Sequence, residues 1–400
     1  MLNLRTSNFK LPFAHIRKKN YLCTLKVMKI VRSILFVINA ILALGLVLTT
    51  LAGAIAPSRS IIPSLLAFGY VPMLLANLAM VLIWLFMGRW ELLLSVAAIA
   101  VRWTMVPLLL QAGGTSKVPS LEEHPSRVTL MTYNVHQFQG NGTETARNDS
   151  IARLFVGLVR TESPDVLCLQ EYAAVRGVSV TDSLATMGYN HYYGAHTASD
   201  GTPYGTAVFS RFPITYVKRL DAEKVLVELF CEGQRMRVIC LHMDSYRFDT
   251  NDLEAVDRMR HGDVKEYMRQ SDTLGHAADN STLAKVKETI RSHEEEWNTT
   301  VAPVIDESST PTIVAGDLND IPFSWLYHQL SHRLTDTFTE CGTGFSTTYR
   351  IGSPDMPRAP LSFRIDMVFR SEGLRTLSYK RIRTPLSDHY PVMVAVEFAI

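Results

Sequence analysis

Acidic, amide and imidazole side chains recur at the ends of short apolar runs in the second half of this 400-residue sequence. These side chains are Asn134, Glu171, His242, Asp317, Asn319, Asp366, Asp388 and His389. Any one of them is as readily a turn residue, because Asn and Asp form local hydrogen bonds with their own backbone. Their repetition after one run after another favours a shared site, since the strands of a rigid sheet can bring end residues to one point.

The residue types fit metal-assisted hydrolysis of a phosphoester. The oxygens of Glu171, Asp388 and Asn134 suit a hard cation such as Mg²⁺, which keeps several waters and needs few protein ligands. Zinc would require closer clustering of His and Cys than this chain offers. Two imidazoles, His242 and His389, together with further carboxylates can move protons and stabilise phosphoryl charge. We therefore expect Mg²⁺ as the cofactor, with Mn²⁺ as the alternative.

The elements that must position these side chains are about ten short β-type runs within residues 127–400, which favour a sheet core in layers with flanking helices. Apolar residues at helical spacing predict a helix over 150–162, and 282–307 is predicted to form one long helix. The polar residues 246–280 show no clear period and are expected to form an insert over one edge of the core.

The first 120 residues have a different texture. They hold 12 Lys and Arg but a single acid, Glu91, whereas residues 121–400 have a balance of −9; the formal net charge of +2 hides this division. Hydrophobic runs at about 30–56, 61–87 and 91–111 each approach the roughly 20 residues that a membrane-spanning helix needs. Arg102 is the weak point of the third run, because a mid-membrane arginine costs at least about 2.5–3.5 kcal/mol. Buried helices of a soluble core, and a signal peptide for the first run, are the alternatives.

The expected organisation is a basic segment (1–29), a three-helix membrane anchor (30–111), a linker (112–126) and a catalytic domain (127–400). The basic N-terminal segment predicts a cytoplasmic N-terminus. Three crossings then place the catalytic domain outside the cytoplasm, whereas failure of the third span would reverse its orientation. The composition, with 47% hydrophobic and 20% charged residues, excludes collagen-like and wholly disordered chains, and five cysteines exclude a disulfide-built miniature fold.

Seven short motifs in the second half carry a resemblance to a known superfamily. They are Thr132-Tyr-Asn134, Leu169-Gln-Glu171, Gly205-Thr-Ala-Val-Phe-Ser-Arg211, Leu241-His242, Ala315-Gly-Asp-Leu-Asn319, Arg364-Ile-Asp366 and Ser387-Asp-His-Tyr-Pro391. In this order the chain from about residue 127 to residue 400 resembles the endonuclease/exonuclease/phosphatase superfamily, which includes deoxyribonuclease-like enzymes and neutral sphingomyelinases. The resemblance implies a four-layer α/β sandwich of two mixed β-sheets flanked by helices, here preceded by an all-α transmembrane region.

The same resemblance implies a role for each motif residue. Glu171 would be the principal metal ligand, with Asn134 and Asp388 close to the ion. The number of metal ions, one or two, stays open. Tyr390 departs from the superfamily, where a basic residue is common.

The remaining implied roles concern proton transfer and the phosphoryl group. Asp317 would position or deprotonate the attacking water, and Asn319 would donate to a phosphoryl oxygen. His389 would contact the phosphate as imidazolium, held by Asp366. His242 would sit beside the leaving group.

The leading hypothesis is therefore a membrane-anchored, Mg²⁺-dependent phosphodiesterase or phosphatase that acts outside the cytoplasm on a lipid head group or a small phosphoester. Its partners would be the bilayer and the phosphoester, and its oligomeric state stays open. The alternative is a metal-dependent endo- or exonuclease. Nucleic acid is disfavoured because duplex binding draws on Lys and Arg, and residues 121–400 are net acidic without a basic stripe. A non-catalytic interaction module is disfavoured because every matched polar position is filled.

Overall fold

The computed structural model describes residues 13–139, 148–175, 177–194, 204–246, 282–350 and 363–399. The chain divides into two compact units. The helical unit takes Met1–Thr49 and Gly69–Trp103, and the sheet unit takes Thr50–Phe68 and Thr104–Ile400. The polar insert expected at 246–280 lies, apart from its first residue, outside the described residues.

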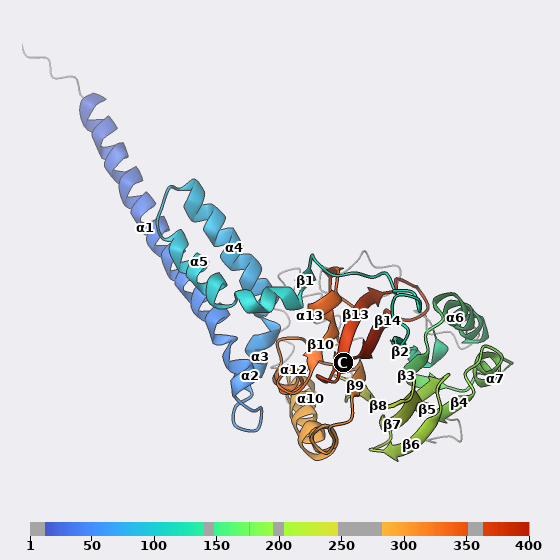
Figure 1. The fold of residues 1–400 in the computed structure, drawn as a ribbon. Coiled ribbons are helices and arrows are strands. Elements are labelled where there is room, and N and C mark those ends of the chain that lie inside the picture. Colours follow the sequence, from blue (N-terminus) through green and yellow to red (C-terminus); the bar gives the residue numbers. More distant parts are fainter. Residues whose placement is uncertain are drawn as a thin grey trace, which may run out of the picture. The chain divides into compact units, whose positions relative to one another are not determined.

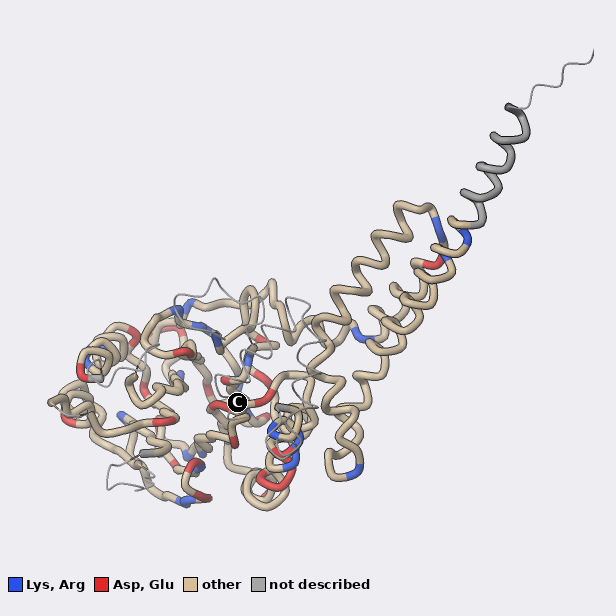
Figure 2. Tube along the Cα trace, turned by 180° about the vertical axis from the view of Figure 1, so that it is seen from behind, with Lys and Arg blue, Asp and Glu red and all other residues tan. Residues whose placement is uncertain are grey.

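The helical unit consists of α1 (Phe13–Leu48), α4 (Tyr70–Phe86) and α5 (Leu92–Val101). Large apolar side chains lie on its outside, as for Ile41 and Leu75. A helix of a soluble protein places polar residues on that outer face. The helical unit differs from that pattern, because in Figure 2 its described helices are almost free of Lys, Arg, Asp and Glu.

The interior of the helical unit holds polar contacts. Arg32 pairs with the carboxylate of Glu91, and the hydroxyl of Ser95 donates to the side-chain oxygen of Asn39. Asn39 also donates to the backbone carbonyl of Glu91 at 3.3 Å. These contacts join α1 to α5 and to the residue before it.

The expectation of three membrane-spanning helices is not supported. Within the described residues one stretch, Val27–Ala54, is long and apolar enough to cross a membrane. Ile62–Phe68 and Tyr70–Phe86 pass the same test only together, and a bend of 61° separates them. The third run forms a helix of only 10 residues, because Arg102 ends it and a 3-10 helix, η1 (Trp103–Leu108), follows with Pro107 inside.

The sheet unit contains two six-stranded sheets (Figure 1). The first has the order β10 (Thr335–Asp336), β12 (Asp366–Arg370), β9 (Thr312–Asp317), β8 (Gln234–His242), β7 (Lys224–Cys231), β6 (Ile214–Arg219). The second has the order β13 (Leu374–Arg381), β14 (Val392–Phe398), β2 (Val128–Asn134), β3 (Val166–Ala173), β5 (Tyr204–Ser210), β4 (His191–Gly194). Both are mixed, because β8 and β9 pair in parallel, as do β2 and β3, while their other pairs are antiparallel. The predicted α/β sandwich is confirmed.

Neighbouring residues of one strand explain the layers. Successive side chains of a strand point to opposite faces of its sheet. Leu130 packs between the two sheets in one core cluster with Val238 of the other sheet. Met131, the next residue, packs on the outer face in a cluster with Phe155 and Val159 of α6 (Asn148–Glu162). The helix predicted over 150–162 is thus present and begins two residues earlier.

Further helices complete the sheet unit. They are η2 (His136–Phe138), α7 (Val180–Ala185), α10 (Thr282–Glu296), the π-helix η5 (Trp297–Val301), α11 (Ala302–Asp306), α12 (Trp325–Ser331) and α13 (Thr337–Cys341). The single helix predicted over 282–307 is thus three consecutive pieces, α10, η5 and α11. On β12 the ring of Phe369 lies 5.6 Å from that of Tyr327 in α12, which covers this sheet from outside.

Residues 50–68 pack within the sheet unit, although the sequence predicted them as part of the anchor. They form α2 (Leu51–Ala54) and α3 (Ile62–Phe68). The backbone N–H and the hydroxyl of Ser58 both donate to the carboxylate of Glu294 in α10, each at 2.6 Å. The ring of Phe68 stands edge-on to Tyr246 at 5.8 Å.

The predicted linker also contacts the sheet unit. Directly before it, at the end of the predicted anchor, a two-stranded ribbon pairs β1 (Leu110–Gln111) with β11 (Gly344–Phe345). The backbone N–H of Thr115 donates to the carbonyl of Cys341 at 3.0 Å. A side chain at Gly114 would collide with that carbonyl, since a Cβ there would lie 2.1 Å from it.

Candidate active site

The ends of five strands bring the polar residues of both sheets together. In the first sheet His242 and Asp317 are register partners at the ends of the parallel strands β8 and β9. Asp366 begins the antiparallel strand β12 directly opposite Asp317. In the second sheet Asn134 ends β2, and Glu171 lies near the end of the parallel strand β3.

Asn134 is buried and joins the two sheets. Its amide nitrogen lies 3.0 Å from Oε1 of Glu171 and 3.0 Å from Oδ2 of Asp317. The side-chain oxygen Oδ1 of Asn134 accepts the backbone N–H of His136 at 3.0 Å. The amide therefore fixes the spacing of two carboxylates that come from different sheets.

Glu171 owes its direction to an irregularity of β3. The pairing of β3 with β5 shifts register between Leu169 and Tyr172, and Glu171 has a positive φ of 50°. A bulge of this kind turns a side chain out of the regular alternation. A non-glycine residue at positive φ is strained, and such strain concentrates at functional sites. The bulge leaves the Glu171 side chain 20% exposed among buried neighbours.

Asp317 is held at both carboxylate oxygens. Oδ2 accepts the amide of Asn134, and Oδ1 accepts the backbone N–H of Asn319 at 2.9 Å. Asn319 has a positive φ of 47°, and its side-chain amide donates to the carbonyl of Met243 at 2.9 Å. This tight turn after β9 ties the Asp317 loop to the residue that follows His242.

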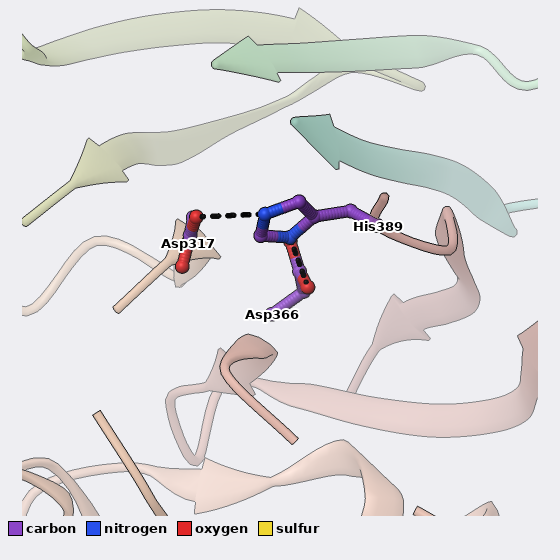
Figure 3. Close-up of side chains that lie close together, drawn as sticks. All are labelled: Asp317, Asp366 and His389. Atoms are coloured by element: carbon purple, nitrogen blue, oxygen red, sulfur yellow. Dashed lines mark hydrogen bonds and ion pairs between the residues drawn. The ribbon is translucent and has the colours of Figure 1, made fainter. Parts of the chain in front are cut away.

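His389 lies between two carboxylates (Figure 3). Its Nδ1 is 2.9 Å from Oδ2 of Asp366, and its Nε2 is 3.7 Å from Oδ2 of Asp317. Burial by itself would lower the pKa of His389, but the charges of Asp366 and Asp317 outweigh it and raise the pKa to about 10. His389 is therefore an imidazolium at neutral pH, with its Nε2 side towards Asp317.

His242 has a similar environment on the other side of Asp317. Its Nδ1 lies 3.3 Å from Oε2 of Glu223, and its Nε2 lies 3.9 Å from Oε1 of Glu171 and 4.0 Å from Oδ2 of Asp317. Burial opposes protonation, yet the hydrogen bond with Glu223 and the charges of Asp317 and Glu171 raise the pKa of His242. It is thus also poised to carry a proton.

Asp388 stands at the more open side of the site, with its side chain 29% exposed. Its Oδ1 accepts the hydroxyl of Ser387 at 3.1 Å and lies 3.6 Å from Nδ1 of His136. The Ser387 hydroxyl also lies 2.9 Å from the backbone carbonyl oxygen of Asn134. This serine therefore connects the loop before β14 to the end of β2.

The donor set fits a hard divalent cation. Glu171, Asp317, Asp366 and Asp388 are four carboxylates, so the two imidazoles of His242 and His389 could not balance them even when both are protonated. The side chains of Glu171 and Asp388 are more exposed than those of Asp317 and Asp366. The side-chain oxygen Oδ1 of Asn134 has a second lone pair besides the one that accepts the His136 N–H. Oxygen ligands with access for water are what Mg²⁺ prefers.

In the described part of the chain the His, Cys, Asp and Glu residues form a different group whose ligand atoms lie within 4.8 Å of one another, namely Asp317, Asp366 and His389. Two of its members already bond to each other at 2.9 Å, so their facing atoms are engaged. We therefore keep Asn134, Glu171 and Asp388 as the predicted metal ligands.

The structure thus brings the eight predicted site residues to one edge of the sandwich, linked through Asn134 and Asp317. Their roles stay predictions. Sequence reasoning missed the residues that support them. Glu223 holds His242, and the ring of Tyr349 lies 4.9 Å from that of His389. No spacing in the sequence indicates either contact, since both come from loops.

A buried His–Asp pair behind the site was also missed. Nδ1 of His293, in α10, lies 3.3 Å from Oδ2 of Asp320, and its Nε2 donates to the carbonyl of Asp244 at 2.8 Å. Asp320 directly follows Asn319, and Asp244 follows His242 by two residues. His293 therefore clamps the two loops that carry those site residues. Its only sequence signal was a histidine on a predicted helix.

Comparison with known families matches both halves of the chain. The model of the endonuclease/exonuclease/phosphatase family matches residues 131–389. A domain of unknown function matches residues 32–108. No curated protein matches the sequence.

Several solved structures are similar to the sheet unit. One is an endonuclease/exonuclease/phosphatase from Beutenbergia cavernae, with 17% identity, a TM-score of 0.44, and coverage of 68% of this chain and 72% of that chain. A family protein from Leptotrichia buccalis has 17% identity and a TM-score of 0.43, covering 68% of this chain and 100% of that chain. One from Bacteroides thetaiotaomicron has 19% identity and a TM-score of 0.44, covering 68% and 98%.

Proposed function

Because this chain belongs to the endonuclease/exonuclease/phosphatase family of phosphoester hydrolases, we propose that it is a membrane-anchored, Mg²⁺-dependent phosphodiesterase or phosphatase. Its substrate is a lipid head group or a small phosphoester outside the cytoplasm. The observation that carries the catalytic part is the buried His389–Asp366 pair facing Asp317 across 3.7 Å.

Each side chain has a chemical task that its surroundings support. Asp317, oriented by two hydrogen bonds, accepts a proton from the attacking water. As the water oxygen bonds to phosphorus, negative charge grows on the phosphoryl oxygens. His389 is a buried imidazolium beside that position and stabilises the charge, with Asp366 fixing its ring.

The leaving oxygen needs a proton when its bond to phosphorus breaks. His242 supplies it, because Glu223 and the nearby carboxylates raise the pKa of its imidazole and favour the protonated form. Mg²⁺, when bound by Glu171, Asn134 and Asp388, supplies positive charge that offsets the anionic substrate.

The membrane part of the proposal rests on α1. The stretch Val27–Ala54, which begins in α1 and ends with α2, is apolar and long enough to span, and Lys and Arg are abundant before it. By the positive-inside rule the N-terminus is cytoplasmic. We propose that α4 and α5 complete an anchor that places the sheet unit on the outer side.

A lipid or small phosphoester is favoured over nucleic acid because of the charge distribution. Residues 121–400 have a balance of −9, and Figure 2 shows Lys and Arg interspersed with Asp and Glu over the described sheet unit. Nucleic-acid binding draws on a basic surface that neutralises many phosphates.

The test uses the full chain purified in a neutral detergent. A panel of phospholipids, sugar phosphates and DNA is assayed with Mg²⁺ and with EDTA. We expect release of phosphate or of a phosphorylated head group, dependent on Mg²⁺ and abolished by Asp317→Asn. Cleavage of DNA alone would establish the nuclease instead, and activity unchanged by EDTA would refute the metal dependence.

Topology is tested separately. A reporter that is active only outside the cytoplasm, fused after Ile400, is expected to be active, and the chain is expected in the membrane fraction. A reporter active only in the cytoplasm would reverse the proposed orientation, and recovery of the chain in the soluble fraction would refute the anchor.

A further inference from the structure

A basic cavity lies outside the group of eight site residues. It has a volume of about 300 Å³ and is lined by the end of β13 and by residues around β11. None of the eight site residues lines it. Its charged lining residues are Lys380, Arg381 and Arg383, three cations within four positions. In a half of the chain that is net acidic, this concentration of positive charge is unusual.

The cations of this cavity are poorly neutralised. Lys380 pairs with Glu162 at 2.5 Å. Within the described residues neither Arg381 nor Arg383 has a carboxylate partner; Arg381 donates instead to the carbonyls of Phe345 at 2.9 Å and Thr347 at 2.6 Å. Burial and the neighbouring charge of Arg383 lower the pKa of Arg381, so a bound anion would relieve an existing repulsion.

The cavity wall is also partly apolar and exposed. Phe345 lines it and is 68% exposed, and its ribbon partner Leu110 is 44% exposed. Exposed aromatic and aliphatic side chains beside cations are typical of surfaces that rest in the head-group region of a bilayer. In Figure 1 the labels β1, α13 and β13 mark the elements that carry or neighbour these lining residues.

The ribbon is close in sequence to the proposed anchor. Leu110 follows Val101, the last residue of α5, by nine positions. A chain reaches at most about 3.5 Å per residue, so anchoring α5 in a bilayer also keeps Leu110 near its surface. A phosphate at the bilayer surface is then the anion that this cavity meets most often.

We propose that this cavity binds the phosphate of an anionic phospholipid such as phosphatidylglycerol, with Phe345 and Leu110 in the head-group region. Arg381 is held by backbone carbonyls and shapes the wall, while Arg383, which has no carboxylate partner in the described part of the chain, turns onto the phosphate. The site is non-catalytic and orients the sheet unit on the membrane. It rests on the membrane attachment proposed above and is independent of the reaction.

The test compares lipid binding by the full chain in neutral detergent, with EDTA present to suppress metal-dependent binding at the catalytic residues. Native mass spectrometry counts bound dihexanoyl phosphatidylglycerol and dihexanoyl phosphatidylcholine. We expect preferential retention of phosphatidylglycerol. Since one cation near a membrane surface contributes about 1 kcal/mol, Arg383→Gln is expected to weaken that binding about fivefold, and Arg383→Lys to retain most of it.

Arg235→Gln is the matched control, because Arg235 is an exposed arginine on β8 and does not line the cavity. Equal losses in Arg383→Gln and Arg235→Gln, or no preference for phosphatidylglycerol, would overturn the proposal. Inorganic phosphate or a short oligonucleotide that binds with the same Arg383 dependence, while the lipid does not, would assign the cavity to that ligand instead.

Membrane fractionation of the same variants separates this inference from the proposed anchor. If the chain is in the membrane fraction but Arg383→Gln binds phosphatidylglycerol as tightly as the wild type, the lipid site alone is refuted. A soluble chain refutes the anchor and, with it, the orienting role.

Discussion

Nδ2 of Asn134 lies 3.0 Å from Oδ2 of Asp317, and this hydrogen bond joins the two sheets at the candidate active site. Asn134 ends β2 of one sheet and Asp317 ends β9 of the other. The same nitrogen contacts Glu171, so one amide sets the position of a predicted metal ligand relative to the predicted general base. A donor shared by both carboxylates offsets part of their mutual repulsion, because hydrogen bonds to charged groups are the stronger ones.

Replacing Asn134 tests this link. Asn134→Ala removes the donor between the buried carboxylate of Asp317 and the partly exposed carboxylate of Glu171, so kcat is expected to fall at least about tenfold. Asn134→Asp adds a third negative charge and is expected to be worse. Steady-state kinetics and thermal unfolding check both variants. Asn298→Ala, at an exposed asparagine on η5, is the control and is expected to behave like the wild type.

The His389–Asp366 pair is expected to act as one unit. Asp366→Asn removes the charge that keeps His389 protonated, and His389→Gln removes the imidazolium, so each is expected to lower kcat by about 10²-fold or more. Because both changes disable the same function, the double variant is expected to be hardly slower than the worse single variant. Fully additive losses in this double-mutant cycle would mean that the two residues act separately.

The motif residues of this site could be predicted from the sequence because each stands at a strand end or within a few residues of one, where a sheet limits its position. Glu223 could not, since it precedes β7 in a turn and reaches His242 only through the pairing of the first sheet. His293 had no motif at all. Its partner Asp320 is adjacent in sequence to Asn319, but their relation to α10 depends on tertiary packing.

The fold was predictable to a similar limit. The number of predicted strands indicated a layered sheet core with flanking helices, and the resemblance of the motifs implied the four-layer sandwich. The sequence did not assign Leu130 and Met131 to the inner and outer faces that they occupy. Residues 50–68 were misjudged because apolar composition alone does not distinguish a membrane span from a helix that packs on a protein. Ser58 and Phe68 contact Glu294 and Tyr246, and these contacts span more than 170 positions of sequence.

Metal dependence can be tested at Glu171. Glu171→Gln keeps the size and hydrogen-bonding capacity of the side chain but removes its charge, so the Mg²⁺ concentration for half-maximal activity is expected to rise at least about tenfold. Mg²⁺ is also expected to raise the unfolding temperature of the wild-type chain and to raise it less in the variant, because a ligand of the folded state stabilises it. An unchanged Mg²⁺ requirement would remove Glu171 from the ligand set.

The His293–Asp320 pair predicts a pH-dependent stability. Burial would lower the pKa of His293, but Asp320 and, more weakly, the Asp244 carbonyl and Glu296 raise it. A raised folded-state pKa stabilises the fold below the unfolded-state value of about 6.5, and this contribution is lost as the pH rises through the folded value. Tyr246, whose ring lies 6.0 Å away, faces the same histidine, and burial raises its pKa well above the ordinary value.

His293→Gln therefore tests the pair through stability and not through activity alone. The unfolding temperature of the wild type is expected to exceed that of the variant by more at pH 5.5 than at pH 9. His332→Gln, at an exposed histidine after α12, is the control and is expected to show no such difference. A gap that is constant with pH would mean that His293 only fills space.

Gly316 is the backbone position on which the turn before Asn319 depends. It has a φ of +154°, and a Cβ there would lie 1.9 Å from the carbonyl oxygen of Leu241 on the neighbouring strand β8. Gly316→Ala is expected to destabilise the fold by on the order of 3 kcal/mol, since strained backbone and overpacking add, and to lower activity through Asp317. Gly157→Ala, on the exposed face of α6 with open space around it, is expected to stabilise by about 1 kcal/mol, because alanine is the better helix former. Thermal and urea unfolding of both variants measure the change in the free energy of unfolding, which is expected to be a loss for Gly316→Ala and a gain for Gly157→Ala. An unchanged free energy of unfolding in Gly316→Ala would show that β8 and β9 can separate without cost.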